Sequence, residues 1–160
     1  MQRTSLKNRQ HEPATKQPLE LGEFLCFAIY SAGHAFNRVY QPLLKELELT
    51  YPQFIAMVVL WGHDGPTVGE LGDELFLQSN TLTPMLKRLE ALGYIKRSRD
   101  SADERQVRIH LTEKGRKLHV QASGIVRAVR DATGLEDKQM KELVIDVDAL
   151  RSKLQSHDSR

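Results

Sequence analysis

The sequence predicts a mainly α-helical protein with one small β-hairpin, an α+β chain in which long helices precede and follow a central domain. Apolar residues recur at steps of three and four from Leu21 to Leu44, which is the period of an amphipathic helix. Apolar and polar residues alternate from Val107 to Leu111, which is the period of a half-buried strand. The 160 residues are 40% hydrophobic and 28% charged, the balance of an ordinary globular protein.

N-cap residues predict where the helices begin. Capping boxes, in which a Thr is followed three residues later by Glu or Gln, predict helix starts after Thr50, Thr67 and Thr133. Ser79 and Thr112 are expected to cap two further helices through their hydroxyl groups.

Gly and Pro predict where the elements end. Pro42 is expected to end or bend the first helix, because its ring removes a backbone donor. Gly93 is expected to end the helix after Ser79 as a C′ glycine. Strands are then predicted over 94–99 and 107–111, joined by a polar turn.

These elements predict a domain organisation with three parts. Residues 1–18 are polar, lack the apolar segment of a signal peptide, and are expected to form a disordered tail. Residues 50–112 hold the central domain, and 19–49 with 113–156 form helical arms on either side of it. The stripe of Met and Leu between 140 and 154 suits either an intrachain core or packing against a partner. No membrane span is predicted, and a cytoplasmic protein is expected.

Charge is distributed unevenly along the central part of the chain. Residues 50–78 hold four acids and no Lys or Arg, whereas 79–119 hold ten Lys or Arg and five acids, a local net charge of +5. The overall net charge of +2 therefore hides a basic segment, which is typical of a surface that binds phosphates.

The order of elements in this segment predicts a winged helix-turn-helix. In this fold the second helix of the pair enters the major groove of DNA with its N-terminal residues against base edges. Arg side chains near the hairpin tip can enter the narrow, negative minor groove. The sequence places these candidate DNA-binding residues in the second helix and the hairpin: Gln78, Ser79, Asn80, Thr81, Thr83, Lys87, Arg88, Arg97, Arg99 and Arg105.

The run from Val68 to Gly115, with Asp103-x-Arg105, Leu111-Thr112 and Gly115 as its most recognisable signature, resembles the MarR family of transcriptional regulators. The resemblance implies a winged-helix homodimer that binds a palindromic operator in double-stranded DNA and usually represses transcription. It also implies that the helices over 19–49 and 113–156 form the dimerisation domain. It also implies that Asp103 braces Arg105, which enters the minor groove.

Three segments resemble the organic-hydroperoxide-resistance regulators (OhrR) within that family: the helix EFLCFAIYSAGHAFNRVYQPLL, the later LTYPQF and SNTLTPMLKRLE. The resemblance implies that Cys26 is a peroxide sensor and that Tyr40 and Tyr51 of one subunit support the partner's Cys26. A two-cysteine branch of this group carries a second, resolving thiol. The present chain has one cysteine, so oxidised Cys26 is expected to condense with a small cellular thiol or a backbone nitrogen.

The residues themselves support part of this hypothesis. Cys26 lies close to the predicted helix start, where the helix dipole stabilises a thiolate modestly. Tyr40 follows it by 14 residues, about 21 Å along a helix at 1.5 Å per residue, so the two cannot touch within one helix. Without the resemblance, a lone Cys on an apolar helix is more often an inert small hydrophobe.

The hypothesis is thus a redox-sensing repressor that releases its operator when an organic hydroperoxide oxidises Cys26. One alternative keeps DNA binding but senses a small aromatic ligand in the dimer cleft. A thiol peroxidase is the weaker alternative, because the chain lacks a resolving thiol and other catalytic motifs. The protein is accordingly expected not to be an enzyme. No cofactor or metal is expected, since the six His show no close ligand spacing.

Overall fold

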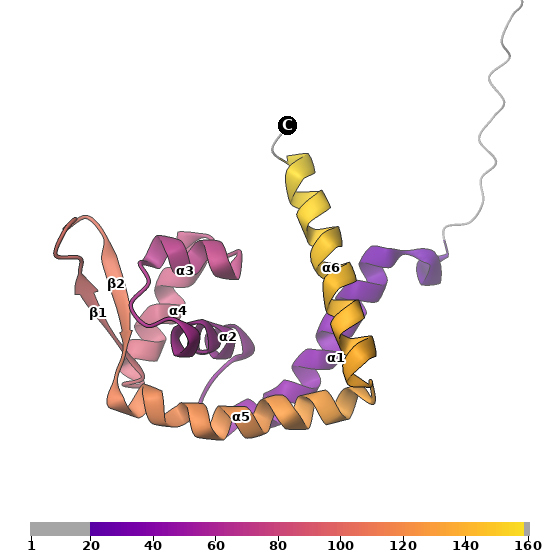
Figure 1. The fold of residues 1–160 in the computed structure, drawn as a ribbon, viewed down its shortest axis with the longest axis horizontal. Coiled ribbons are helices and arrows are strands. Elements are labelled where there is room, and N and C mark those ends of the chain that lie inside the picture. Colours follow the sequence, from indigo (N-terminus) through magenta and orange to yellow (C-terminus); the bar gives the residue numbers. More distant parts are fainter. Residues whose placement is uncertain (1–19, 159–160) are drawn as a thin grey trace, which may run out of the picture. The chain divides into compact units, whose positions relative to one another are not determined.

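The computed structural model describes residues 20–158, and the predicted tail over 1–18 lies outside this range. The described chain divides between Gly33 and His34, inside its first long helix, into two compact units. The elements in chain order are a 3₁₀ turn, six α-helices and two strands (Figure 1): η1 Leu21–Glu23, α1 Leu25–Lys45, α2 Tyr51–Gly62, α3 Val68–Leu75, α4 Ser79–Ala91, β1 Ile95–Arg99, β2 Val107–Leu111, α5 Glu113–Thr133 and α6 Asp137–Asp158.

The sequence predicts that Pro42 ends or bends the first helix. It lies inside α1 and does not end it, so the prediction of a helix end at Pro42 is wrong. The helix continues to Lys45 and closes in a turn in which the amides of Leu47 and Leu49 donate to the carbonyl of Leu44. Glu48, in this turn, has a left-handed backbone with φ 54°. Because Leu44 is fully buried, packing holds the final turn of α1 in place despite the missing proline donor.

Local signals explain the ends of the central elements. The capping boxes at Thr50 and Thr67 are both formed, with Gln53 and Glu70 returning hydrogen bonds to the cap amides. Gly93 has φ 75° after α4, as predicted for a C′ glycine. Thr112 caps α5 by accepting from the amide of Gly115.

Two predicted caps are wrong. Ser79 is the first residue of α4, and Gln78 occupies the N-cap without a side-chain cap hydrogen bond. The third capping box does not form, because α5 ends at Thr133 and Gly134 takes a left-handed conformation. The next helix is capped farther on, where the amide of Glu136 donates to the side chain of Gln139.

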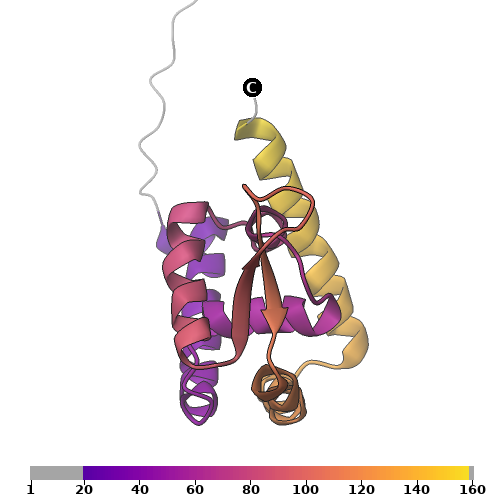
Figure 2. The ribbon, with the colours of Figure 1, turned by 90° about the vertical axis from the view of Figure 1, so that its left-hand side faces the viewer.

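The two strands form an antiparallel hairpin that packs beside α3 and α4 (Figure 2). Its register pairs Ile95 with Leu111 and Arg97 with Ile109. The other edge of β2 is covered by the chain before α3: the amide of Ile109 donates to Pro66, and its carbonyl accepts from Gly65. This edge is therefore joined to the helical domain by backbone hydrogen bonds.

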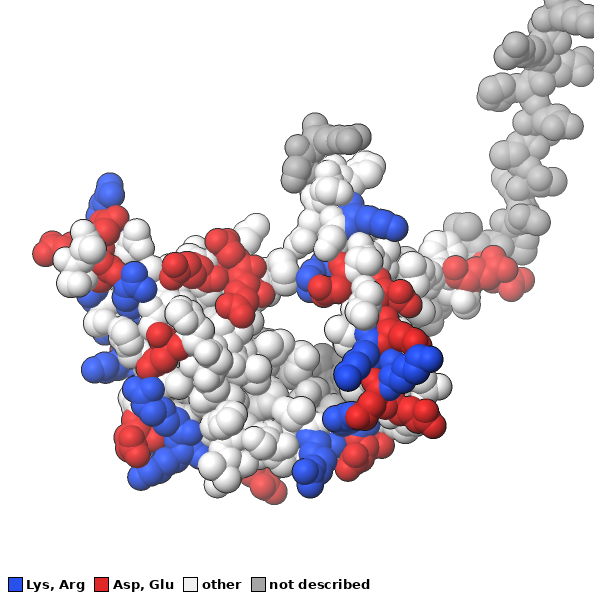
Figure 3. Space-filling view, in the orientation of Figure 1, with Lys and Arg blue, Asp and Glu red and all other residues white. Residues whose placement is uncertain are grey.

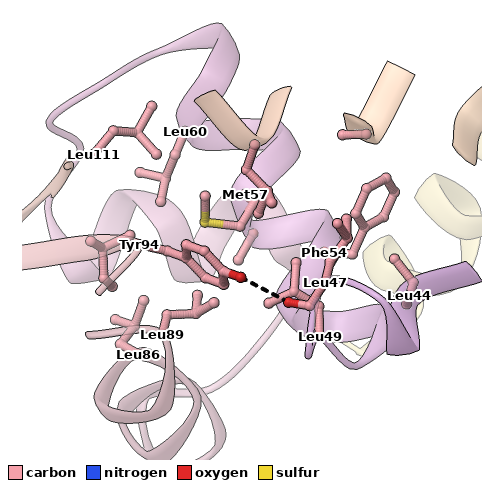
Figure 4. Packing of buried hydrophobic residues seen from close by; sticks show 14 of the residues in the cluster. Leu44, Leu47, Leu49, Phe54, Met57, Leu60, Leu86, Leu89, Tyr94 and Leu111 are labelled. Atoms are coloured by element: carbon pink, nitrogen blue, oxygen red, sulfur yellow. Dashed lines mark hydrogen bonds between the residues drawn. The ribbon is translucent and has the colours of Figure 1, made fainter. Parts of the chain in front are cut away.

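A single apolar core joins these elements, and Leu60, Leu82, Leu89 and Ile109 within it are completely buried. The Tyr94 hydroxyl donates to the carbonyl of Leu47 over 3.0 Å, so the start of the hairpin is tied to the turn after α1 (Figure 4). The core thus packs the start of the hairpin against α4 and the turn after α1.

Helix α6 leaves most of its apolar side chains exposed in the single chain. Ile145 is 65% and Leu154 61% exposed, and Leu143, Val144 and Val147 are also exposed. The intrachain-core interpretation of this stripe is therefore wrong for most of its length. None of the helices within residues 20–158 combines the length and apolarity that a membrane crossing requires.

Candidate nucleic-acid interface

Helix α4 divides its residues cleanly between the core and the surface. Leu82, Leu86 and Leu89 are buried and anchor one face. The predicted base-reading side chains at its start are all exposed: Gln78, Ser79, Asn80, Thr81 and Thr83. These side chains carry hydroxyl and amide groups, which can donate to or accept from base edges in a major groove.

At the tip of the hairpin, Asp103 holds Arg105. The Asp103 carboxylate accepts from Nε of Arg105 over 3.0 Å and from Nη2 over 3.2 Å. It also accepts from the Arg105 backbone amide over 3.1 Å. These hydrogen bonds lower the pKa of Asp103, the side-chain contact being the larger cause. The Arg105 side chain is nevertheless 90% exposed. Asp103 thus holds it in one orientation while it stays accessible to a ligand.

The loop of the hairpin is organised around Asp100, which directly follows β1 and is only 6% exposed. Its carboxylate accepts from the backbone amides of Ala102 and Asp103, which closes the turn at the hairpin end. It also accepts from Nε of Arg108, whose Nη1 donates to the carbonyl of Gly65 over 2.8 Å. Asp100 and Arg108 therefore link the wing to the loop before α3.

Arg97 is held by a residue of α4. The Glu90 carboxylate accepts from the Arg97 backbone amide over 3.0 Å and from Nε over 2.8 Å, and Nη2 lies 2.7 Å away. The pKa of Glu90 is lowered, first by the side-chain hydrogen bond and then by the backbone one. Among the predicted DNA-binding residues, Arg97 thus has its guanidinium already engaged within the protein.

The structure brings part of the predicted set together. Ser79, Thr83, Arg97 and Arg105 line one open cleft of about 570 Å³ between α3, α4 and the hairpin. Arg88 lines a different groove, described below, and Lys87 is exposed on α4. Nη1 of Arg99 lies 3.5 Å from the Glu104 carbonyl.

The surface charges follow the division that the sequence indicates. Figure 3 shows Lys and Arg along the hairpin side of the molecule and acidic side chains over α3. The acids on α3 are Glu70, Asp73 and Glu74. A polyanion would accordingly be attracted to the hairpin and α4 and repelled by α3.

Tyr40 and Tyr51, which the resemblance links to the sensor, lie against each other. Their ring centroids are 4.7 Å apart, and Tyr40 also packs on Phe54 of the core. Burial raises the pKa of both hydroxyls, and the neighbouring Tyr51 raises that of Tyr40 further. Both hydroxyls therefore stay protonated and can donate hydrogen bonds.

Cys26 lies in the first turn of α1 and is exposed. It belongs to the first compact unit, in which Phe27 and Tyr30 make an aromatic contact with centroids 6.4 Å apart. Within residues 20–158, His, Cys, Asp and Glu form no group of three or more that is arranged to hold a metal ion.

Comparison with known proteins identifies the family. The family described as "Transcriptional regulator SarA/Rot" matches residues 38–121. The HTH-type transcriptional regulator TtmR of Methylorubrum extorquens (strain PA1) is 44% identical over 148 residues, 92% of this chain and 76% of that protein. The organic hydroperoxide resistance transcriptional regulator of Bacillus subtilis (strain 168) is 42% identical over 126 residues, 77% of this chain and 86% of that protein.

The chain belongs to the SarA/MarR family of winged-helix transcriptional regulators.

Solved structures agree with this membership. Reduced AbfR bound to DNA is 34% identical to this MarR-family regulator, with a TM-score of 0.68 over 81% of this chain and 90% of that one. Overoxidized AbfR bound to DNA gives 35% identity and the same TM-score over 81% and 91%. A MarR regulator from Methanosarcina mazei Go1, 24% identical, has the same fold with a TM-score of 0.74 over 84% and 98%.

Sequence patterns do not identify three residues that organise the interface of this MarR-family regulator. Glu90, Asp100 and Arg108 position the hairpin, but in the sequence they stand out only as charges. For Glu90 the sequence does offer one indication of a partner. Glu90 and Arg97 have opposite charges and stand on either side of Gly93, where the chain reverses direction, so an ion pair between them could have been predicted. Arg108 contacts Gly65, which is 43 residues away, and local sequence carries no sign of such a contact.

Proposed function

We propose that this protein is a transcriptional repressor that binds palindromic operator DNA as a homodimer and releases it when an organic hydroperoxide oxidises Cys26. The observation that carries the DNA-binding part is the exposed polar start of α4 beside an exposed Arg105 that Asp103 already orients. AbfR, 34% identical, has a structure described as reduced and bound to DNA, which supports the same activity here.

Each candidate residue has a role that its position supports. The five polar residues at the start of α4 face base edges in the major groove. Lys87, Arg88 and Arg99 neutralise phosphates, which supplies affinity without sequence preference. Arg105 enters the minor groove, and Asp103 reduces the conformational entropy that Arg105 loses on binding.

Dimerisation explains the palindrome. Two helix-turn-helix units related by a twofold axis read two half-sites about 34 Å apart, one turn of DNA. The exposed apolar residues of α6 and of the first part of α1 are the surfaces we assign to the dimer. Six large apolar side chains are exposed in the unit that ends at Gly33: Leu21, Phe24, Leu25, Phe27, Ile29 and Tyr30.

The redox step is an oxygen transfer at sulfur. The Cys26 thiolate attacks the hydroperoxide ROOH, the O–O bond breaks, and the products are a sulfenic acid and the alcohol ROH after one proton is taken up. A small cellular thiol then condenses with the sulfenic acid, which forms a mixed disulfide and releases water. The exposure of Cys26 and its place in the first turn of α1 support both steps.

Tyr40 and Tyr51 support the reduced state. Their protonated hydroxyls donate hydrogen bonds to the thiolate of the partner subunit, and the bulkier oxidised sulfur no longer fits beside them. Oxidation then favours a dimer whose recognition helices do not match the operator. A difference of about 3 kcal/mol between the two states costs more than a hundredfold in affinity.

A Cys26→Ser variant tests the proposal directly. We expect it to bind the operator like the wild type and to stay bound when cumene hydroperoxide is added, because serine cannot be oxidised. Mobility shifts before and after peroxide give the affinity, and mass spectrometry on wild-type Cys26 identifies the adduct. Release of the variant by peroxide would remove Cys26 as the sensor.

A second candidate function keeps DNA binding, but a small aromatic acid, and not a peroxide, releases the protein from its operator. The observation that favours it is a groove of about 1050 Å³ between α1, the start of α2 and α4, which Arg38, Lys45 and Arg88 line. Release by a salicylate-like acid but not by peroxide, in the same mobility shift, would select this candidate.

A further inference from the structure

Glu90 and Arg97 connect the end of α4 to the middle of β1. Glu90 is one residue from the end of α4, and Arg97 is the third residue of β1. Three N–H groups of Arg97 point to the one carboxylate at 2.7–3.0 Å. The chain between them turns at Leu92 and Gly93, so the ion pair closes this corner.

The register of the hairpin places Arg97 on the side that faces the helices. Paired residues of an antiparallel hairpin share a face, and Arg97 pairs with Ile109, which is completely buried. The Arg97 side chain is 32% exposed, compared with 90% for Arg105. Arg97 therefore lies in the wall of the cleft between hairpin and helices, with much less of its surface available to DNA.

The backbone of Arg97 gives Glu90 a second role. The amide and carbonyl of Ile109 bond to the segment before α3, so the Arg97 amide faces the opposite, outer edge of the hairpin. Glu90 accepts from this amide, which would otherwise have to find a partner in water. The same carboxylate thus holds both the backbone and the side chain of β1.

We propose that Glu90 is a positioning residue that fixes the wing at the angle to the recognition helix needed for DNA binding, and that Arg97 is its structural partner and not a phosphate contact. The proposal rests on the DNA-binding function proposed above. Base reading by α4 and minor-groove entry by Arg105 must occur together on one duplex. A wing that is free to swing would have to be ordered on binding, at a cost in affinity.

The two roles of Arg97 predict opposite effects of Glu90→Gln. If Arg97 contacted a phosphate, the substitution would free the guanidinium and remove a negative charge near DNA, and binding would tighten. If Glu90 positions the wing, the same substitution loosens the wing and weakens binding. The sign of the change separates the two roles.

The test measures binding to the duplex that the wild-type protein selects from a random-sequence pool, labelled with fluorescein, over a series of salt concentrations. We expect Glu90→Gln and Arg97→Ala each to weaken binding about tenfold, and the double variant to weaken it no further, since the two share one interaction. The salt dependence should stay that of the wild type for Arg97→Ala. A lost phosphate contact would lower its slope by about 0.9. The exchanged pair Glu90→Arg with Arg97→Glu should recover at most part of the affinity, because an arginine at position 90 cannot accept from the backbone amide of residue 97.

A second readout does not depend on DNA. Hydrogen exchange of the Arg97 amide should be slow in the wild type and fast in Glu90→Ala, which removes both acceptor oxygens, with the core amide of Leu86 protected in both. Tighter binding by Glu90→Gln, a lower salt slope for Arg97→Ala, or an unprotected Arg97 amide in the wild type would overturn the proposal. If the wild type selects no duplex, the DNA-binding function fails. Unchanged exchange along β1 in Glu90→Ala would overturn the positioning role independently.

Discussion

The Arg105 side chain is held in one orientation by Asp103 while 90% of its surface remains exposed. Pre-orientation matters for a long side chain, because a free arginine loses rotamer entropy of about 2 kcal/mol when it is immobilised on a ligand. The cost of ordering Arg105 is met within the protein, so its contact with DNA retains more of its interaction energy.

An Arg105→Ala variant is therefore expected to bind the operator about tenfold or more weakly, with the fold intact, since the side chain packs against nothing buried. Asp103→Asn should give a smaller loss, because it keeps Arg105 but weakens its orientation. Fluorescence anisotropy at fixed salt measures both affinities, and circular dichroism checks the fold. Equal affinities for Arg105→Ala and the wild type would remove the wing tip from the interface.

The wing as an element depends on a buried carboxylate at the start of its loop, that of Asp100. The pKa of Asp100 lies below its usual range, first because of the Asp103 backbone amide, then Arg108 and then the Ala102 amide. The ionised form thus stabilises the closed wing. This contribution is complete above the ordinary aspartate pKa of about 3.9 and is lost as the pH falls through the lowered value.

The wing should accordingly loosen as the pH is lowered below the ordinary aspartate pKa of about 3.9. The amide resonances of Ala102 and Asp103 report this, because both donate to Asp100. In Asp100→Asn these resonances should already resemble the loosened state at neutral pH and should change less on acidification. An identical titration of the variant and the wild type would show that another group controls the wing.

The joint between the hairpin and α5 tolerates no side chain at Gly115. A Cβ there would lie 2.0 Å from the backbone oxygen of Tyr94, which cannot move without displacing the start of β1. Gly115 also donates its amide to Thr112 and accepts from the Trp61 indole, so both its polar groups are used. The wing and α5 therefore meet through backbone atoms.

Gly115→Ala should lower the free energy of unfolding by more than about 2 kcal/mol, as expected for overpacking against backbone. Gly124→Ala is the matched control on the same helix, because a Cβ at Gly124 would have nothing within 4 Å of it. There the better helix propensity of alanine should raise stability by up to about 1 kcal/mol. Urea unfolding at one protein concentration compares the two, and a loss of equal size in both would contradict the close contact at Gly115.

Local chemistry explains which elements the sequence predicts well. Thr67, Gly93 and Thr112 act on their own helix ends, so their effects follow from neighbouring residues. Ser79 and Thr133 carry similar signals, but the turn at 76–78 and the left-handed Gly134 set those helix boundaries first. The contacts that shape the candidate site, Arg97 with Glu90 and Tyr40 with Tyr51, join different elements and require the tertiary structure.

At the scale of the whole molecule, the single chain leaves a large part of its apolar surface without a partner. Ile145 is 65% exposed and Val144 60% exposed on α6, a helix that makes few contacts with the remaining elements of its unit. Full burial of one such side chain contributes about 1.5–3 kcal/mol, and a twofold interface counts it twice. The same faces therefore provide enough free energy to support a dimer.

Ile145→Glu should weaken that dimer strongly, because a twofold interface would bury two unpaired carboxylates. Sedimentation equilibrium should show mainly monomer at concentrations where the wild type is dimeric. Operator affinity should fall in parallel, since a monomer engages one half-site and loses the gain in effective concentration that links two. Val120→Glu is the control, because Val120 lies on α5, is 79% exposed and is outside the two faces assigned to the dimer. If Ile145→Glu stayed dimeric while Val120→Glu dissociated, the interface would lie on α5 and not on α6.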